Sequence, residues 1–145
     1  MQTSEQGLTL IKKFENFSAK SYICPAGKPT IGYGHVIVTG EEFSIGEIDL
    51  NMAEVLLKQD VMQREQAINC LIQVTLLQNQ FDAIISFVYN VGVQAFDKST
   101  LLSLINQNDI LAAAEQFGRW IYVNGVVSSG FISRRAAEKV VFTTP

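Results

Sequence analysis

The stretch ENFSAKSYICPAGKPTIGYGH, residues 15–35, decides how the rest of this 145-residue chain is interpreted. It holds a glutamate, a cysteine, a threonine and the chain's single histidine among glycines, prolines and aromatic residues. The preceding residues 7–14, GLTLIKKF, place apolar side chains three apart, which predicts a short amphipathic helix. Glu15 is therefore expected at the end of a helix, where its carboxyl group can be held rigidly.

Composition and charge limit the possible functions. With 48% hydrophobic and 17% charged residues, the chain is typical of one globular domain. A net charge of -3 gives no basic field for nucleic acid, so that partner is not expected. No apolar run approaches the roughly 18 residues of a membrane span, and MQTSEQGLTL lacks the pattern of an export signal. We expect a monomer without stable membrane association, made in the cytoplasm.

The residues from Ser21 to Thr39 mix β-formers with turn residues and predict a small β-rich lobe. An acidic turn, EEFSIGEIDL at 41–50, precedes a helical pattern over 51–72, with Asp49 or Asn51 as its N-cap. The ends of that helix are apolar and its middle is polar. Such a helix is expected to connect two lobes and to leave a cleft along its flank.

The remainder of the chain reads as helical. Residues 78–91 are apolar nearly all round and are followed by Gly92, which predicts a buried central helix. Further helices are expected at 100–106 after Ser99, at 110–120 after Asn108 or Asp109, and at 132–142 after the loop VNGVVSSG. The predicted fold is α+β in a single domain, with an N-terminal lobe at about 14–50, a connecting helix at about 51–72, and an all-helical lobe at about 73–145 that includes residues 1–13.

Glu15 is the first candidate for chemistry. A glutamate at a helix end is commonly only solvated, but Phe14 and Phe17 can exclude water here and raise the carboxyl pKa toward that of a general acid. Thr30 can equally be read as a strand former, and His35 as a structural residue. No metal site and no cofactor are expected, because no cluster of ligands stands at metal-binding spacing.

Cys24 raises a different possibility. With His35 and an orienting Asn90, it supplies the residue types of a Cys/His nucleophile pair, as in cysteine peptidases and some wall amidases. Its position before Pro25 in a loop argues against this pair, because an activated thiolate usually gains from a helix N-terminus or an adjacent cation. A disulfide with Cys70 is possible, but Cys70 lies in an apolar helical pattern.

Taken together, the residues form a recognisable set. Glu15, eight residues, Cys24, five residues and Thr30, followed by the run TIGYGH, resemble the phage lysozymes or endolysins of glycoside hydrolase family 24, the T-even coliphage lysozyme type. The resemblance covers almost the whole chain, through the blocks GLTLIKKFE, CPAGKPTIGYGH, LLKQDV, LLQNQFDAIISFVYNVG, FDKSTLL, FGRWIY and RRAAE. It implies the two-lobed lysozyme-like fold.

The resemblance also implies residue roles. Glu15 is the general acid that protonates the glycosidic oxygen, and Cys24 and Thr30 hold the water that attacks from the opposite face. Many family members have Asp at the position of Cys24, and a thiol of unperturbed pKa near 8.5 is mostly neutral at pH 7. Either the pKa of Cys24 is lowered and the thiolate serves as base, or Thr30 does most of the orienting.

Other residues receive supporting roles by the same resemblance. His35 ties down the small lobe, and Arg134 or Arg135 approaches Glu15 and orients its carboxyl group. The expected substrate contacts are Tyr33 and Gly34, with Gln94, Asn124 and Ser128 as further candidates.

The implied activity is hydrolysis of the β-1,4 bond between N-acetylmuramic acid and N-acetylglucosamine in peptidoglycan, with inversion and without metal or cofactor. A phage endolysin without an export signal would depend on a holin to reach the wall in the periplasm. Three alternatives stay open. They are a lytic transglycosylase that uses Glu15 alone, a wall-binding module inactivated by Cys24, and the Cys/His peptidase or amidase.

Overall fold

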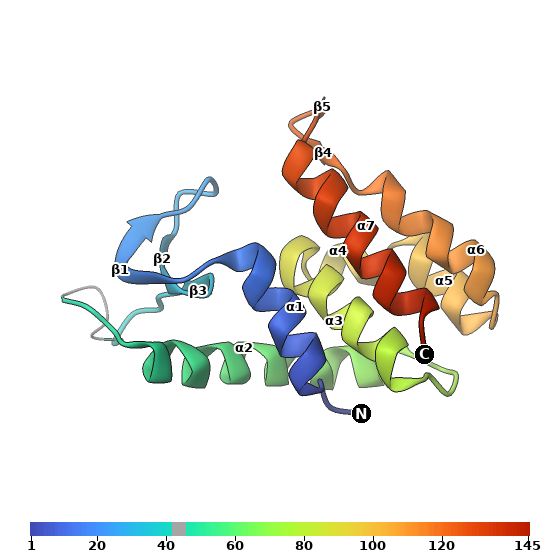
Figure 1. Ribbon diagram of the computed structural model, residues 1–145, viewed down its shortest axis with the longest axis horizontal. Coiled ribbons are helices and arrows are strands. Elements are labelled where there is room, and N and C mark those ends of the chain that lie inside the picture. Colours follow the sequence, from blue (N-terminus) through green and yellow to red (C-terminus); the bar gives the residue numbers. More distant parts are fainter. Residues whose placement is uncertain (42–45) are drawn as a thin grey trace. The chain divides into compact units, whose positions relative to one another are not determined.

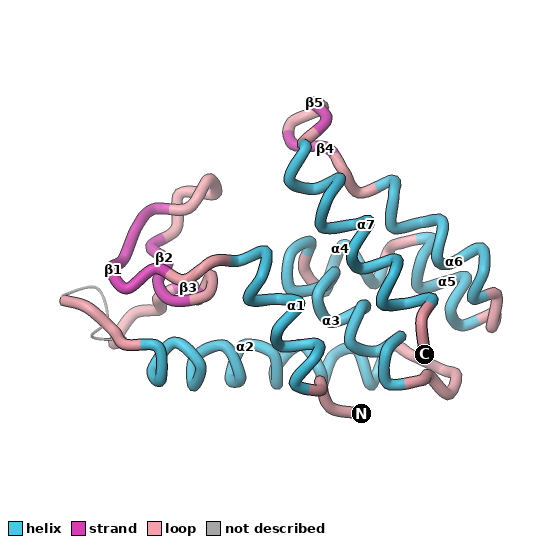
Figure 2. The backbone as a smooth tube through the Cα atoms, viewed as in Figure 1, coloured by secondary structure: helices cyan, strands magenta, loops and turns pink. Residues whose placement is uncertain are grey.

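The computed structural model describes residues 1–41 and 46–145. Its helices and short strands are shown in Figure 1 and, coloured by secondary structure, in Figure 2. Residues 42–45 of the predicted acidic turn lie outside the described residues. No helix in the described part of the chain is long and apolar enough to cross a membrane.

The described chain divides into two compact units. We call Ile11–Gln63 the β unit, and Met1–Leu10 with Arg64–Pro145 the helical unit. The chain crosses from one unit to the other inside α1 (Glu5–Glu15) and again inside α2 (Leu50–Leu71).

The β unit carries a small antiparallel sheet with strand order β1-β2-β3. Its strands are β1 (Ser18–Ile23), β2 (Pro29–Gly32) and β3 (His35–Val36). The register sets Tyr22 opposite Thr30 on the first pair of strands and Ile31 opposite His35 on the second. This register places Tyr22, Thr30 and His35 of the opening stretch on neighbouring strands.

Residues with positive φ occur where the chain passes from α1 into this sheet and at the turn between β2 and β3. Asn16 ends α1 at a φ of 55°, so the chain leaves the helix directly after Glu15. Gly32 and Gly34 flank the turn between β2 and β3 with φ of 68° and 80°. A Cβ on Gly32 would also lie 3.3 Å from the Ile48 side chain. The glycines of the run TIGYGH are therefore required by the backbone.

The helical unit packs around aromatic side chains. The Phe87 ring lies edge-on to the rings of Phe117 and Trp120, at centroid distances of 5.5 and 5.4 Å. Helix α3 packs against α7. The elements are α3 (Gln78–Val91), α4 (Val93–Asp97), α5 (Thr100–Asn106), α6 (Ile110–Gln116), the 3-10 helix η2 (Phe117–Arg119), β4 (Tyr122–Val123), β5 (Val126–Val127) and α7 (Ser129–Thr143).

The predicted α+β class is confirmed, and so are several helix starts. Asp49 Oδ1 accepts the Met52 N–H at 2.8 Å, Ser99 caps α5, and Asp109 caps α6. Helix α3 has the predicted bounds of 78–91.

Three details of the helical unit differ from the prediction. The helix expected over 110–120 is α-helical only to Gln116 and then tightens into η2. The first five residues of the predicted loop VNGVVSSG belong to the β4–β5 hairpin, so this unit is not purely helical, and its last two residues already begin α7. At its turn, Asn124 and Gly125 both adopt positive φ, 51° and 79°, which is typical of a two-residue hairpin. The short helix α4 was not predicted.

Candidate active site

Glu15 is the last residue of α1 and is half-buried. Beside it in the β unit, the Tyr33 ring packs against Phe17 at a centroid distance of 5.8 Å, and the Lys12 ammonium lies 5.7 Å from the Tyr33 centroid. Lys12 also forms an ion pair with Glu54 of α2. These contacts hold the helix end and the turn after β2 together within one unit.

Cys24 lies in the turn between β1 and β2. Its backbone N–H donates to the Lys28 carbonyl at 2.9 Å, and its own carbonyl accepts the Gly27 N–H at 2.8 Å. Gly27 adopts a φ of 78°, which lets the chain reverse within the sequence CPAGK. The tight turn directs backbone N–H groups toward the Cys24 side chain.

The surroundings of Cys24 favour the thiolate. The pKa of the thiol is lowered, chiefly by the backbone N–H of Lys28, against the opposing effect of partial burial. The Thr30 side chain, the Ala26 backbone and the positive charge of Lys28 lower it further. Cys24 and Cys70 are both free, so the possible disulfide is absent. This environment favours the predicted role in which Cys24 is a thiolate and serves as the base.

Thr30 lies on β2 with its side chain buried, at 3% exposure. Its hydroxyl donates to the Lys28 carbonyl at 3.0 Å and also contacts the Cys24 sulfur. Thr30 and Cys24 are therefore neighbours, as two groups that hold one water must be.

Tyr22 is not among the site residues predicted from the sequence, yet its phenol lies near both Glu15 and Cys24. Partial burial raises the pKa of Tyr22, and the negative charges of Glu15 and Cys24 raise it further. Glu15 and Cys24 therefore act electrostatically on one hydroxyl. The sequence signal was available, because Tyr22 precedes Cys24 by two positions in a β-forming run.

His35 is buried between two carboxylates. Its Nδ1 lies 2.8 Å from Asp60 Oδ2, and its Nε2 lies 3.0 Å from Glu41 Oε1. Glu41 in turn accepts the Val38 N–H at 2.7 Å. Both ring nitrogens are thus occupied, which argues against the pairing of His35 with Cys24 as base and nucleophile.

Arg134 and Arg135 lie on α7, buried around Glu138 and forming ion pairs with it. Arg134 also donates to the Ser86 carbonyl at 2.8 Å. Burial raises the pKa of Glu138, although both arginines oppose that rise. The predicted approach of Arg134 or Arg135 to Glu15 stays a prediction.

The remaining predicted contacts lie on different elements. Gln94 is exposed on α4, and Asn124 is exposed at the turn of the β4–β5 hairpin. Ser128 caps α7, where its hydroxyl accepts the Phe131 N–H at 3.2 Å. That capping explains the residue without a ligand. The roles of these residues in substrate binding stay predictions.

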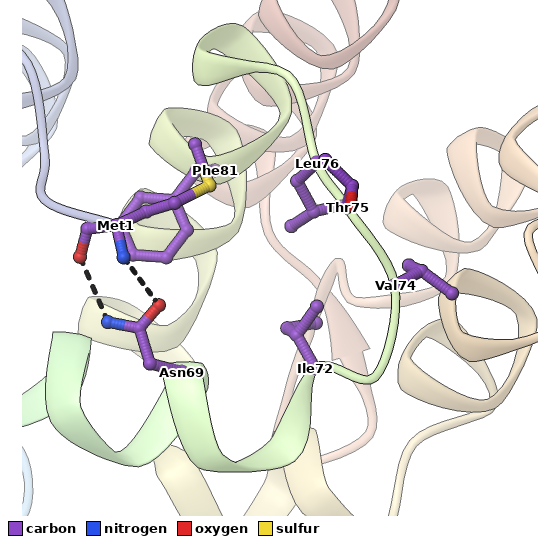
Figure 3. Close-up of a pocket in the computed structure, with 7 residues that line it drawn as sticks. All are labelled: Met1, Asn69, Ile72, Val74, Thr75, Leu76 and Phe81. Carbon is purple, nitrogen blue, oxygen red and sulfur yellow. Dashed lines mark hydrogen bonds between the residues drawn. The ribbon is translucent and has the colours of Figure 1, made fainter.

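Described residues of the helical unit line at least two hollows. The first, of about 350 Å³, is shown in Figure 3, where Met1 and Asn69 exchange two hydrogen bonds of 2.9 Å. Its lining is mainly apolar and offers no carboxyl or thiol group, so it is unsuited to acid–base chemistry. The second, of about 310 Å³, is lined by Asn90, Val91, Arg119, Trp120, Tyr122, Phe131 and Arg135.

A carboxyl group at a helix end, with a thiol and a hydroxyl on the β1–β2 hairpin that follows, is the set of groups that the resemblance to phage lysozymes implies. The phage lysozyme family matches residues 12–138, and the chain belongs to this family. It is 43% identical over 147 residues to the endolysin of Acyrthosiphon pisum secondary endosymbiont phage 1, and covers 98% of both chains. It is 36% identical over 130 residues to the SAR-endolysin of bacteriophage PS119, 88% of this chain and 75% of that one.

A solved structure supports the same conclusion. The muramidase domain of SpmX from Asticaccaulis excentricus matches with a TM-score of 0.90 and 36% identity, covering 99% of each chain. The predicted fold and the predicted endolysin function are thereby confirmed. The chain functions as a phage endolysin, a glycosidase that acts on peptidoglycan.

Proposed function

We propose that the chain is a lysozyme of the T-even coliphage type in glycoside hydrolase family 24. It hydrolyses the β-1,4 bond between N-acetylmuramic acid and N-acetylglucosamine with inversion. The observation that carries this proposal is the contact of the Thr30 hydroxyl with a thiol of lowered pKa at Cys24, in the same unit as the helix-end Glu15. Metal and cofactor are not part of the proposal.

Glu15 begins the reaction as the protonated acid. It gives its proton to the glycosidic oxygen as the bond from that oxygen to C1 breaks, and an oxocarbenium-like centre develops at C1. Arg134 or Arg135 orients the Glu15 carboxyl group in this proposal. Glu15 is left as a carboxylate and regains a proton from solvent.

Cys24 and Thr30 act on the opposite face of the sugar. A water held between them attacks C1, and the Cys24 thiolate accepts the proton that this water loses. The products are a free 4-hydroxyl on one sugar and an inverted hemiacetal on the other, so one water is consumed for each bond cleaved. Inversion needs room for that water, with the acid and base about 6.5–9.5 Å apart.

The two family-related alternatives are less well supported. A lytic transglycosylase needs no water site, whereas Cys24 and Thr30 are in contact and suited to hold water. A wall-binding module would need no ionised thiol, whereas the turn around Cys24 favours the thiolate.

We propose that substrate contacts come from Tyr33 and Gly34 of the β unit. Gln94, Asn124 and Ser128 are further proposed contacts in the helical unit. The second hollow of that unit is an additional candidate, because its aromatic side chains can pack against sugar rings and its exposed Arg119 can bind carboxylates. Alanine substitution of Tyr33 is expected to raise KM for soluble wall fragments more than that of Gln94.

Release to the wall is a separate proposal. We infer a monomer that is made in the host cytoplasm and reaches the periplasm through a holin-type lesion. The name SAR-endolysin of one relative indicates that another release route exists among relatives. Expression without a holin decides the point. We expect no lysis until chloroform is added, and lysis without chloroform would contradict holin dependence.

The activity itself is tested with chloroform-treated Gram-negative cells. Wild type is expected to clear the suspension, and the new ends released are expected to be reducing sugars. New amino groups in place of reducing sugars would indicate a peptidase or amidase, and no clearing would favour a binding module.

A further inference from the structure

Tyr22 shares a face of the sheet with the proposed water site. The β1–β2 register sets it directly opposite Thr30, and directly opposed residues of an antiparallel pair project to the same side. Cys24 lies in the turn just beyond β1, and its sulfur contacts the Thr30 hydroxyl, so the thiol lies on that side as well. The phenol therefore stands on the same side as the thiol and the hydroxyl proposed to hold the water.

The Tyr22 side chain is 41% exposed. Within residues 1–41 and 46–145, its phenol has no hydrogen-bonding partner. The charged groups that act on the phenol are Glu15 and Cys24. A hydroxyl in this position is a donor still available to a bound molecule.

A water held between Thr30 and Cys24 needs a further hydrogen-bond donor. The hydroxyl of Thr30 has a single hydrogen, and the Lys28 carbonyl and the Cys24 sulfur both compete for it. Thr30 can then only accept a hydrogen bond from water, and a Cys24 thiolate can likewise only accept. A water between them donates both of its hydrogens and keeps both lone pairs. One lone pair must attack C1, and nothing so far holds the other.

We propose that the Tyr22 hydroxyl donates a hydrogen bond to the second lone pair of the attacking water, as a third member of the water site. This inference rests on the proposed function and adds a residue to it. Three hydrogen bonds fix the water so that its remaining lone pair faces the sugar. Tyr22 then contributes to the chemical step and adds nothing to ground-state binding of the glycan.

The test is the substitution Tyr22→Phe, which keeps the ring and removes only the hydroxyl. On soluble peptidoglycan fragments we expect kcat to fall about tenfold with KM unchanged, the pattern of an interaction made in the transition state. Ser103→Ala, which also removes a single hydroxyl but from an exposed position on α5, is the control and should match wild type. Circular dichroism and the thermal unfolding midpoint confirm that both variants fold.

A double substitution separates a shared water from an independent effect. Thr30→Val removes the second water-holding hydroxyl, and the loss in Tyr22→Phe/Thr30→Val should be clearly smaller than the product of the two single losses. Independent, fully multiplying losses would overturn the inference. So would a wild-type kcat for Tyr22→Phe, or a raised KM at constant kcat, which would assign Tyr22 to sugar binding.

The proposed function can fail separately. If wild type releases no reducing ends, both the function and the role of Tyr22 are wrong. If wild type is active and Tyr22→Phe equals it, only the role of Tyr22 is wrong.

Discussion

The candidate active site in the β unit and the charged cluster in the helical unit hold their ionisable side chains in opposite ways. In the helical unit, Arg134, Arg135 and Glu138 are 4%, 1% and 0% exposed, and both arginines form ion pairs with Glu138. In the β unit, Glu15 and Cys24 are only half-buried, at a helix end and in a turn. Buried paired charges fix a structure, whereas half-buried groups can exchange protons with solvent and meet a substrate.

The difference separates stability from chemistry. Removing one member of a buried ion pair leaves an uncompensated charge and destabilises a protein strongly. Removing a half-buried acid costs little stability, but it removes the proton that the reaction needs. Substitutions in the two units should therefore affect different measurements.

The largest effect is expected for Glu15→Gln in the β unit. Loss of the general acid should lower wall-lytic activity by about 10²–10⁴, with the free energy of unfolding nearly unchanged. Clearing of chloroform-treated cells measures the activity. Glu5→Gln, an exposed position on the same helix, is the control and should stay active. Full activity of Glu15→Gln would end the acid assignment.

In the helical unit, Glu138→Gln should show the reverse pattern. Because it leaves Arg134 and Arg135 without their buried carboxylate, we expect the free energy of unfolding to fall by about 3–5 kcal/mol. Urea denaturation measures the change. The control is Glu115→Gln, which removes an exposed partner of Lys139 and should cost less than about 1 kcal/mol. An equal loss of unfolding free energy in the two variants would contradict the difference between buried and exposed ion pairs.

How far the sequence predicted these two regions depends on the kind of contact. The fold, helix α3 and the caps Ser99 and Asp109 follow from local patterns, because a cap or an apolar stripe lies within a few residues of chain. The sequence pattern predicts a loop in place of the β4–β5 hairpin, since strands of two residues are too short for a periodic signal.

Long-range pairing was the part that local patterns could not predict. His35 pairs with Asp60, 25 positions away, and Ser86 pairs with Glu138, 52 positions away. The lowered pKa of Cys24 depends on the direction of the Lys28 backbone N–H, which residue types alone do not specify. Spacing and resemblance therefore predict roles for the opening stretch, which stay predictions, but they do not predict its electrostatics.

His35 and its carboxylate partners Asp60 and Glu41 form a buried charged cluster in the β unit, and a substitution of His35 tests it. Burial lowers the pKa of His35, but hydrogen bonds to Asp60 and Glu41 outweigh burial and leave the pKa raised. The stabilisation of the fold by protonated His35 is complete below the unfolded-state pKa of about 6.5. It is lost as the pH rises through the folded-state pKa. We expect His35→Gln to cost about 1.5–3 kcal/mol near pH 6 and less at higher pH.

Urea denaturation of wild type and His35→Gln across this pH range measures the effect. Because His35 is the single histidine, the control is internal: the difference between the two proteins should shrink only above about pH 6.5. A difference that stays constant with pH would contradict the raised pKa.

The smallest change in activity is expected for Cys24→Asp. A carboxylate restores the usual family residue, so lysis comparable to wild type is expected, with Cys24→Ser weaker. In a Cys70→Ser background, the pH profile of iodoacetamide alkylation reports on the Cys24 thiol. Its midpoint should fall below that of a free cysteine, because backbone N–H groups favour the thiolate. Loss in Cys24→Asp as severe as in Glu15→Gln would give the thiol a role that a carboxylate cannot fill.

The central claim is that the β unit carries the groups that hydrolyse the glycan, with Glu15 as the general acid. Its most direct test is digestion of purified peptidoglycan in H₂¹⁸O, followed by mass spectrometry of the fragments. We expect one ¹⁸O at each new muramic acid reducing end, with no such product from Glu15→Gln. Anhydromuramic fragments that lack a water and carry no label would contradict the account.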